Sequence, residues 1–183
     1  MRCFIGLPLP DEYQEGLERL VIHSQSILSS KISWTKKGNW HLTLCFLGEI
    51  DSGTVRILKE ELKNIKHNSF TLKAGYCGFF PSIKRPRVLW LGLEAGAKEA
   101  KSLADKVFKI LEKNNIYFDK KDFIPHLTIG RVKRLSNDRW EKWSKYINSL
   151  KWQSIKISSF VLWQSTLTPK GPIYTPIQKY QLL

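Results

Sequence analysis

The 183-residue sequence lacks several features that would each define a class of protein. It has only three cysteines (Cys3, Cys45 and Cys77), and no CxxC spacing occurs, so neither a disulfide framework nor a zinc site is indicated. These cysteines stand among apolar neighbours, and we expect buried free thiols. No apolar run approaches the roughly 18 residues of a membrane-spanning helix, and the N-terminal segment is too short for a signal peptide. We therefore expect a cytoplasmic protein without a membrane partner.

Acidic residues are also scarce. Asp and Glu together number 16, against 30 Lys and Arg, and the formal net charge is +14. An excess of this size favours a polyanionic partner such as nucleic acid, although a lysine-rich proteome would also produce it. Hydrophobic residues make up 42 % of the chain, which is enough for the core of one domain or of two small lobes.

The most informative feature present is a short motif that occurs twice. His41-Leu42-Thr43-Leu44 and His126-Leu127-Thr128-Ile129 each lie in an apolar run that is typical of a β-strand. Because side chains alternate between the two faces of a strand, the histidine and the threonine of each copy point the same way. Two such pairs facing one another would form a cleft with a general acid and a general base. The other two histidines, His23 and His67, are interpreted as structural or solvent-exposed.

Apolar periodicity predicts strands and helices in a repeated order. A strand, a helix, a His-x-Thr strand and a second helix are expected from Arg2 to Ile65, and the same order returns from Arg87 to Leu150. The expected strands are Arg2–Leu7, Trp40–Leu47, Phe70–Phe80, Arg87–Leu93, His126–Val132, Ser154–Thr166 and Tyr174–Leu182, and the expected helices are Asp11–Leu28, Asp51–Ile65, Lys98–Asn114 and Asp138–Leu150. We therefore predict one α+β domain over residues 1–183, a bilobal duplicated strand–helix–strand–helix unit with two pseudo-symmetric lobes.

Each His-x-Thr pair combines groups that suit phosphate chemistry. Histidine titrates at a pKa of about 6.5, so one ring can accept a proton from water while the other gives one to a leaving alkoxide. Threonine hydroxyls can donate hydrogen bonds to phosphoryl oxygens. The carboxylates near the motifs form no cluster, which argues against metal assistance. A zinc site built on the two histidines is the competing interpretation, but it lacks an obvious third ligand.

The residues around the motifs match one family in the same order along nearly the whole chain. They are Trp34-Thr35, His41–Gly48, Gly78-Phe79-Phe80-Pro81, Arg85–Leu91, Pro125–Arg131 and Leu167–Tyr174. Together they closely resemble the 2H phosphoesterase superfamily. Within it they resemble the LigT/ThpR type, the RNA 2′,3′-cyclic phosphodiesterases first noted as 2′-5′ RNA ligases.

This resemblance implies a bilobal fold in which two antiparallel or mixed sheets surround a central groove lined by the motif strands. It implies hydrolysis of an RNA 2′,3′-cyclic phosphate end to a 2′-phosphomonoester, with no metal or other cofactor. His41 would be the proton donor to the 3′ oxygen, and His126 would be the proton acceptor that activates water. Thr43 and Thr128 would hold the non-bridging oxygens. RNA with such an end would be the partner, and nothing in the sequence demands a protein partner or more than a monomer.

Arg131 has two possible orientations. Strict alternation from His126 places it on the outer face of its strand, whereas a bulge at Gly130 would turn it back toward the phosphate. The function also has alternatives. The same site could perform 2′-5′ phosphodiester ligation or hydrolysis, and a non-catalytic module could bind RNA through a basic groove alone.

Further RNA contacts are predicted around a basic turn. Lys84, Arg85 and Arg87 could follow the RNA backbone, although lysines and arginines in turns are often simply solvated. Phe79 or Phe80 could stack a terminal base of the RNA, and one of the two must face the core. We predict that Phe79 is the residue that contacts RNA. The stripe of Trp140, Trp143, Tyr146 and Ile147 has helical spacing and is interpreted as core.

Overall fold

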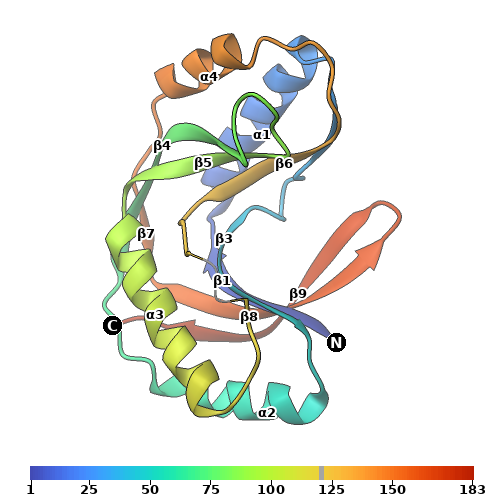
Figure 1. Cartoon of the computed structure of the whole chain (residues 1–183). Helices are drawn as coiled ribbons and strands as arrows, with labels where there is room; N and C mark the ends of the chain where they lie inside the picture. Colours follow the sequence, from blue (N-terminus) through green and yellow to red (C-terminus); the bar gives the residue numbers. More distant parts are fainter. Residues whose placement is uncertain (120–121) are drawn as a thin grey trace.

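The computed structural model describes residues 1–119 and 122–183 (Figure 1). These residues form helices together with an antiparallel sheet, so the predicted α+β class is confirmed. The strands are β1 (Arg2–Pro8), β2 (Lys31–Trp34), β3 (His41–Glu49), β4 (Phe70–Phe80), β5 (Val88–Ala95), β6 (Leu127–Arg134), β7 (Ile155–Ile157), β8 (Ser159–Thr168) and β9 (Gly171–Gln181). The helices are α1 (Asp11–Ile27), α2 (Ser52–Glu61), α3 (Ala97–Lys113) and α4 (Trp140–Ser149), with a 3₁₀ turn at Leu62–Asn64.

The strands form two groups that meet at one point. Their order is β7-β4-β5-β6-β3-β1-β8-β9, with β2 beside β6, and all the pairings are antiparallel. The motif strands β3 and β6 meet where Leu42 pairs with Leu127. We call β3, β1, β8 and β9 the first-motif lobe, and β7, β4, β5, β6 and β2 the second-motif lobe. The two sheets expected from the sequence are therefore joined into one curled path (Figure 1).

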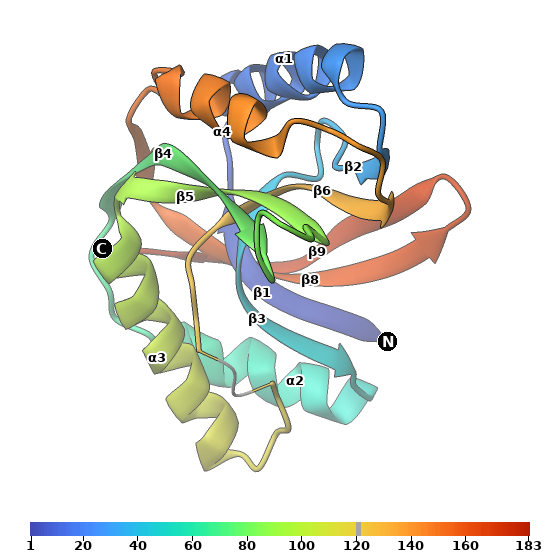
Figure 2. The same cartoon turned by 45° about the horizontal axis from the view of Figure 1, so that its top comes forward.

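The helices are exchanged between these lobes. Helix α1 follows β1 of the first-motif lobe but lies with α4 over the second-motif lobe (Figures 1 and 2). There the Ala74 amide of β4 donates to Tyr13 Oη at 2.7 Å, and Trp143 Nε1 of α4 donates to Ser24 Oγ at 2.9 Å. Helix α3 follows β5 of the second-motif lobe but packs against β3 beside α2. One cluster of buried apolar side chains consequently runs through both lobes.

The helices bury the faces that their sequences predict. In α4, Trp140, Trp143 and Ile147 are buried, and Tyr146 is partly buried against the same core. Burial of this stripe removes large aromatic surfaces from water and fixes α4 on the second-motif lobe. The stripe is therefore core, as predicted.

Two predicted elements are divided in the structure. The helix expected over Asp51–Ile65 ends at Glu61 and continues as a 3₁₀ turn. The segment expected as one strand over Ser154–Thr166 is divided into β7, which pairs with β4, and β8, which pairs with β1. The chain crosses between lobes at Ser158, and an apolar pattern does not specify which neighbour a strand pairs with. The basic segment before the first motif includes the short strand β2, which pairs with β6.

The cysteines are free thiols in this fold. Cys3 and Cys45 are buried as expected, whereas Cys77 is only partly buried. Burial raises the pKa of Cys45 to about 12, so this thiol is not a nucleophile at neutral pH. Within the described part of the chain, no helix is long and apolar enough to cross a membrane.

Candidate active site

The junction between the lobes brings the two motifs together. His41 is the first residue of β3, and His126 immediately precedes β6, which starts one residue later than predicted. Leu42 and Leu127 pair across the junction, and both side chains are fully buried. Extending this antiparallel register by one residue each way sets His41 across from Thr128. The same step sets Thr43 across from His126, and all four side chains lie on the face opposite the buried leucines.

Both imidazoles are held by the same backbone contact. His41 Nδ1 lies 2.8 Å from the carbonyl oxygen of Asn39, and His126 Nδ1 lies 2.7 Å from that of Ile124. A carbonyl oxygen only accepts hydrogen bonds, so Nδ1 of each ring carries the hydrogen and donates it. In the neutral ring, Nε2 therefore keeps its lone pair. Each histidine can accept a proton at Nε2 when neutral and return it from Nε2 when charged.

Burial lowers the pKa of both histidines. For His41, desolvation is the largest cause and the charge of His126 adds to it, so the pKa falls to about 4 although the Asn39 carbonyl opposes the shift. For His126, desolvation again lowers the pKa, the Ile124 carbonyl opposes it, and the charge of Arg131 lowers it further. Both rings are therefore neutral near pH 7 in the free protein. An anion bound between them would favour a proton on one ring.

A β-bulge decides where Arg131 points. Thr128 and Gly130 of β6 pair with adjacent residues of β5, so Ile129 is an extra residue in β6. Because a bulge of one residue resets the alternation of faces, Arg131 falls on the same face as Thr128. Its charge reaches His126 and lowers the pKa of that ring. Of the two orientations left open by the sequence, the structure has the inward one, with the bulge at Ile129 rather than Gly130.

The first motif has an equivalent bulge. Thr43 and Cys45 of β3 pair with adjacent residues of β1, so Leu44 is extra. Phe46 therefore takes the place in β3 that Arg131 takes in β6. Its side chain is 53 % exposed. The two halves of the site thus share a backbone form and differ at this position, where one presents a cation and the other an aromatic ring.

Aromatic rings surround His41. The ring centroids of Phe4, Tyr174 and Trp163 lie 4.6, 5.1 and 5.7 Å from that of His41. Burial raises the pKa of Tyr174, against the opposing charges of Arg131 and Arg2, so its hydroxyl stays protonated and can donate. Sequence reasoning assigned none of these three rings to the site. Only Tyr174 carried a signal, because it ends the closing segment that resembles the family.

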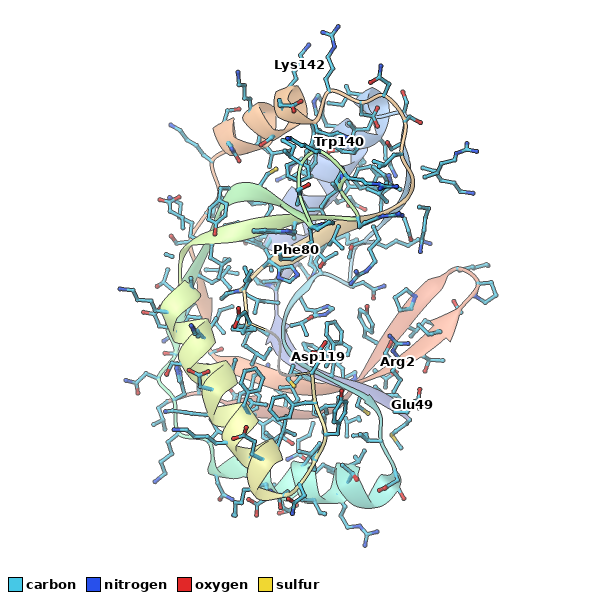
Figure 3. All side chains as sticks on the ribbon, viewed as in Figure 1. Arg2, Glu49, Phe80, Asp119, Trp140 and Lys142 are labelled. Carbon is cyan, nitrogen blue, oxygen red and sulfur yellow. The ribbon has the colours of Figure 1, made fainter. Side chains whose placement is uncertain are left out.

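Phe80, rather than Phe79, lies at the site. The Phe80 ring is 5.2 Å from His126, and it stacks on Trp90 at 4.8 Å. Phe79 instead packs against Trp143, at 5.8 Å, in the core beneath α4. In Figure 3, Phe80 lies on the inner side of the second-motif lobe. The choice of Phe79 is therefore corrected, because the strand pairing places Phe79 on the face of buried Leu89.

A buried glutamine holds the loop that precedes His41. Gln14 of α1 is only 5 % exposed, and its Nε2 donates to the Trp40 carbonyl at 2.8 Å. Its Oε1 accepts a hydrogen bond from the Gly38 amide at 3.1 Å. The glutamine thereby fixes the backbone on both sides of Asn39, whose carbonyl accepts the hydrogen bond from His41 Nδ1. Nothing in the sequence distinguished this glutamine from a surface residue of a helix.

The segment Trp34-Thr35 braces the second motif. The Thr35 hydroxyl donates to the Thr128 carbonyl at 2.9 Å, and the Thr35 amide donates to the Ile129 carbonyl at 2.9 Å. These bonds fix the backbone at the bulge that orients Arg131. A segment that comes before the first motif in sequence therefore supports the second motif in space.

The basic turn lies at the tip of the β4–β5 hairpin. Lys84, Arg85 and Arg87 are exposed there, and the Arg87 carbonyl accepts from the Val132 amide of β6 at 2.9 Å. The turn is therefore next to β6 beyond Arg131, and its role as an RNA contact stays a prediction.

The donor set of the site suits an anion. Two hydroxyls, two imidazoles and one guanidinium converge, and guanidinium and hydroxyl groups bind phosphate oxygens well. Across residues 1–119 and 122–183, no three His, Cys, Asp or Glu side chains gather into a metal-binding group. The fold and the site are those expected of a phosphoesterase.

Comparison with known proteins identifies the family. A model of the LigT like Phosphoesterase family matches residues 7–90 and again residues 91–174. The chain belongs to this family, as the resemblance of its motifs predicted.

Relatives match over nearly the full length. The chain is 32 % identical to an RNA 2′,3′-cyclic phosphodiesterase of Aquifex aeolicus, over 100 % of this chain and 97 % of that protein. It is 34 % identical to one of Thermotoga maritima, over 99 % and 95 %. The fold matches that of TT0787 of Thermus thermophilus with a TM-score of 0.81 at 24 % identity, over 99 % and 97 % of the chains. It also matches E. coli LigT complexed with 3′-AMP, with a TM-score of 0.77 at 22 % identity, again over 99 % and 97 %.

Proposed function

We propose that this protein hydrolyses the 2′,3′-cyclic phosphate at an RNA 3′ end to a 2′-phosphomonoester by acid–base catalysis between two histidines. The observation that carries the proposal is the placement of His41 and His126 on one face of the lobe junction, each with Nε2 available. The substrate is supported by relatives at 32 % and 34 % identity that are named RNA 2′,3′-cyclic phosphodiesterases.

The proposed reaction is an in-line displacement at phosphorus. His126 Nε2 takes a proton from water, and the water oxygen forms a bond to phosphorus. The bond between phosphorus and the 3′ oxygen breaks on the opposite side, and that oxygen takes a proton from His41 Nε2. Thr43, Thr128 and Arg131 hold the non-bridging oxygens, on which negative charge increases. The product carries its phosphate on the 2′ oxygen.

The surroundings of the two rings support these roles. Arg131 disfavours a proton on His126, which suits a ring that must start neutral as a base. The rings of Phe4 and Trp163 lie beside His41 and can contact an imidazolium there once a bound phosphate favours its proton. Since the pKa of free His41 is about 4, the bound phosphate anion has to raise it before His41 can act as the acid.

The test uses two cyclic substrates and two variants. His41→Ala and His126→Ala are assayed on an RNA that ends in a 2′,3′-cyclic phosphate and on its analogue with sulfur in place of the 3′ oxygen. A thiolate leaves without protonation, so the analogue should restore turnover by His41→Ala but not by His126→Ala. Equal restoration of both variants would contradict the assigned roles, and full activity of either variant on the natural substrate would contradict the mechanism.

Product analysis separates the alternatives. A 2′-phosphomonoester at the RNA end supports the proposal, and 2′-5′ joined RNA would identify a ligase, since the same proton transfers run in reverse. A non-catalytic RNA-binding module would leave the cyclic end intact and would bind RNA equally well after either histidine substitution.

The proposal also includes the domain organisation, the oligomeric state and the cellular compartment. Residues 1–183 are one domain with two lobes related by an approximate two-fold axis, which is supported by the twofold match of the family model and by the mirrored strand order. The protein works as a monomer in a reducing cytoplasm, and its three free cysteines support the reducing compartment. Size-exclusion chromatography with light scattering tests the monomer.

A further inference from the structure

Strand β6 has a second bulge beyond Arg131. Val132 and Arg134 pair with adjacent residues of β2, so Lys133 is an extra residue. Together with the bulge that follows Thr128, this resets the alternation of faces twice along one short strand. Thr128, Arg131 and Arg134 therefore share the face that carries the two histidines, although they are three residues apart in sequence.

The bulges give these residues an even spacing. From Thr128 to Arg131, and again from Arg131 to Arg134, β6 advances by two residues of its partner strand. Each step is therefore about 7 Å, at about 3.4 Å per residue. This is the scale on which successive phosphates follow one another in an extended single strand of RNA. Lys31 of β2 lies opposite Arg134, so the outer step carries two positive charges.

These charges are not neutralised by the protein. Lys31, Arg131 and Arg134 are exposed, and none of them forms an ion pair with another described residue. Asp138, whose carboxylate lies beside the start of β2, accepts hydrogen bonds from the Ser29 and Ser30 amides at 2.6 and 2.8 Å. Asp138 thus closes the turn before β2.

Two other basic residues near the site, Lys36 and Lys37, are already engaged. Lys36 Nζ donates to the Lys170 carbonyl at 2.8 Å, and Lys37 Nζ lies 3.4 Å from a Glu15 carboxylate oxygen. In the first-motif lobe, Phe46 stands at the position that corresponds to Arg131. Arg131, Arg134 and Lys31 therefore form a basic series along β6 and β2. It starts beside the paired histidines and continues away from them.

We propose that this series, Arg131, Arg134 and Lys31, is a binding track for the RNA strand that precedes the cyclic end. Arg131 faces the reacting phosphate, while Arg134 and Lys31 bind the phosphate on the 5′ side of the terminal nucleotide. The inference rests on the proposed function and narrows its substrate. The enzyme is an oligonucleotide-end phosphodiesterase that uses more than the terminal nucleotide, rather than a hydrolase of free cyclic mononucleotides.

The test removes the outer step of the track and compares substrates of different length. The double variant Lys31→Ala/Arg134→Ala is matched by Arg56→Ala/Lys109→Ala, which removes the same two charges from exposed positions on α2 and α3. Values of kcat/KM are measured for a mononucleotide, a dinucleotide and a trinucleotide, each ending in a 2′,3′-cyclic phosphate, over a range of salt concentrations. Binding of a fluorescent trinucleotide with a 2′-phosphate end is measured in parallel.

The track variant should lose about tenfold in kcat/KM on the dinucleotide and trinucleotide and nothing on the mononucleotide. Its logarithmic salt dependence on the longer substrates should fall by about 0.7 for each lost phosphate contact. The matched variant should behave as the wild type. Equal losses at all lengths, or equal losses in the matched variant, would overturn the track.

Failure of the proposed function would look different. A wild-type protein that hydrolyses no cyclic end contradicts that function, and the binding assay then still decides the track. Tighter binding by the wild type than by the track variant would support the track, and equal binding would overturn it.

Discussion

The two halves of the site have one backbone design and two chemical settings. In each half, a histidine donates Nδ1–H to the carbonyl two residues before it, and the fourth motif residue is an extra residue in its strand. Five residues after the histidine, however, β6 presents Arg131 and β3 presents Phe46. Beside His41 lie Phe4, Trp163 and Tyr174.

This difference teaches how two similar groups can take different roles. The charge of Arg131 disfavours the protonated form of His126, whereas burial among aromatic rings disfavours the protonated form of His41 through desolvation. Backbone geometry alone would make the two rings interchangeable. Their neighbours make them unequal: Arg131 of the motif strand β6 lies near His126, and rings of β1, β8 and β9 surround His41.

Removing either histidine should have the largest effect. His41→Ala and His126→Ala should each lower kcat by about 10²- to 10⁴-fold, because each removes one proton transfer. The double variant should lose little more than the worse single variant, because residues that act as a unit are not additive. Steady-state kinetics measure the losses and circular dichroism checks the fold. Multiplied losses in the double variant would contradict a shared step.

Substitution of Arg131 and of Phe46, the residues five positions after the two histidines, should affect activity unequally. Arg131→Ala should lower kcat/KM by about 10²-fold, because it removes a charge-assisted donor to the phosphate. Phe46→Ala should cost less than about tenfold, because no charge is lost at that position. Both variants are assayed on the same cyclic RNA end. Equal losses would show that the cation does not distinguish the two halves.

Substitution of Gln14 tests the backbone support of His41 without touching the half of the site that contains His126. Gln14→Leu should lower kcat by about tenfold and unfolding free energy by about 1–3 kcal/mol, because the Gly38 amide and the Trp40 carbonyl lose their buried partner. Ser24→Ala is the matched control, since Ser24 is also a buried hydrogen-bonding residue of α1. It should lose stability but retain kcat. A parallel loss of kcat in Ser24→Ala would reduce Gln14 to a structural role.

The pH dependence should give the smallest but most specific effect. Since one ring must be charged and the other neutral, and the pKa of each lies below 6.5, kcat/KM should reach its maximum on the acidic side of pH 6.5. The bound phosphate raises both pKa values, so the maximum of kcat should lie at higher pH. Arg131→Ala should raise the pKa of His126, because a positive charge beside the ring is removed. The part of the pH–rate profile that His126 controls should therefore shift to higher pH. An optimum of kcat/KM above pH 7 would contradict the conclusion that burial lowers the pKa of both histidines.

Much of the fold followed from residue patterns. Helical spacing in Asp138–Leu150 predicted α4 and its buried tryptophans, and the repeated motif predicted two equivalent strands. The patterns did not predict that α1 and α3 each lie on the lobe opposite to the strands that precede them. They also did not divide Ser154–Thr166 between the lobes, because local periodicity contains no information on the distant partner of a strand.

The sequence by itself determined the reactive groups of this protein: two imidazoles, two hydroxyls at fixed spacing, and the family to which they belong. Only the tertiary structure decided their orientation. Bulges at Leu44, Ile129 and Lys133 are visible only as pairing with neighbouring strands, and each one moves every later side chain of its strand to the other face. The lowered pKa of His41 likewise arises from burial among rings that are distant in sequence. Chemistry that depends on residue type can be predicted from the chain, whereas direction and electrostatic environment depend on contacts that form only on folding.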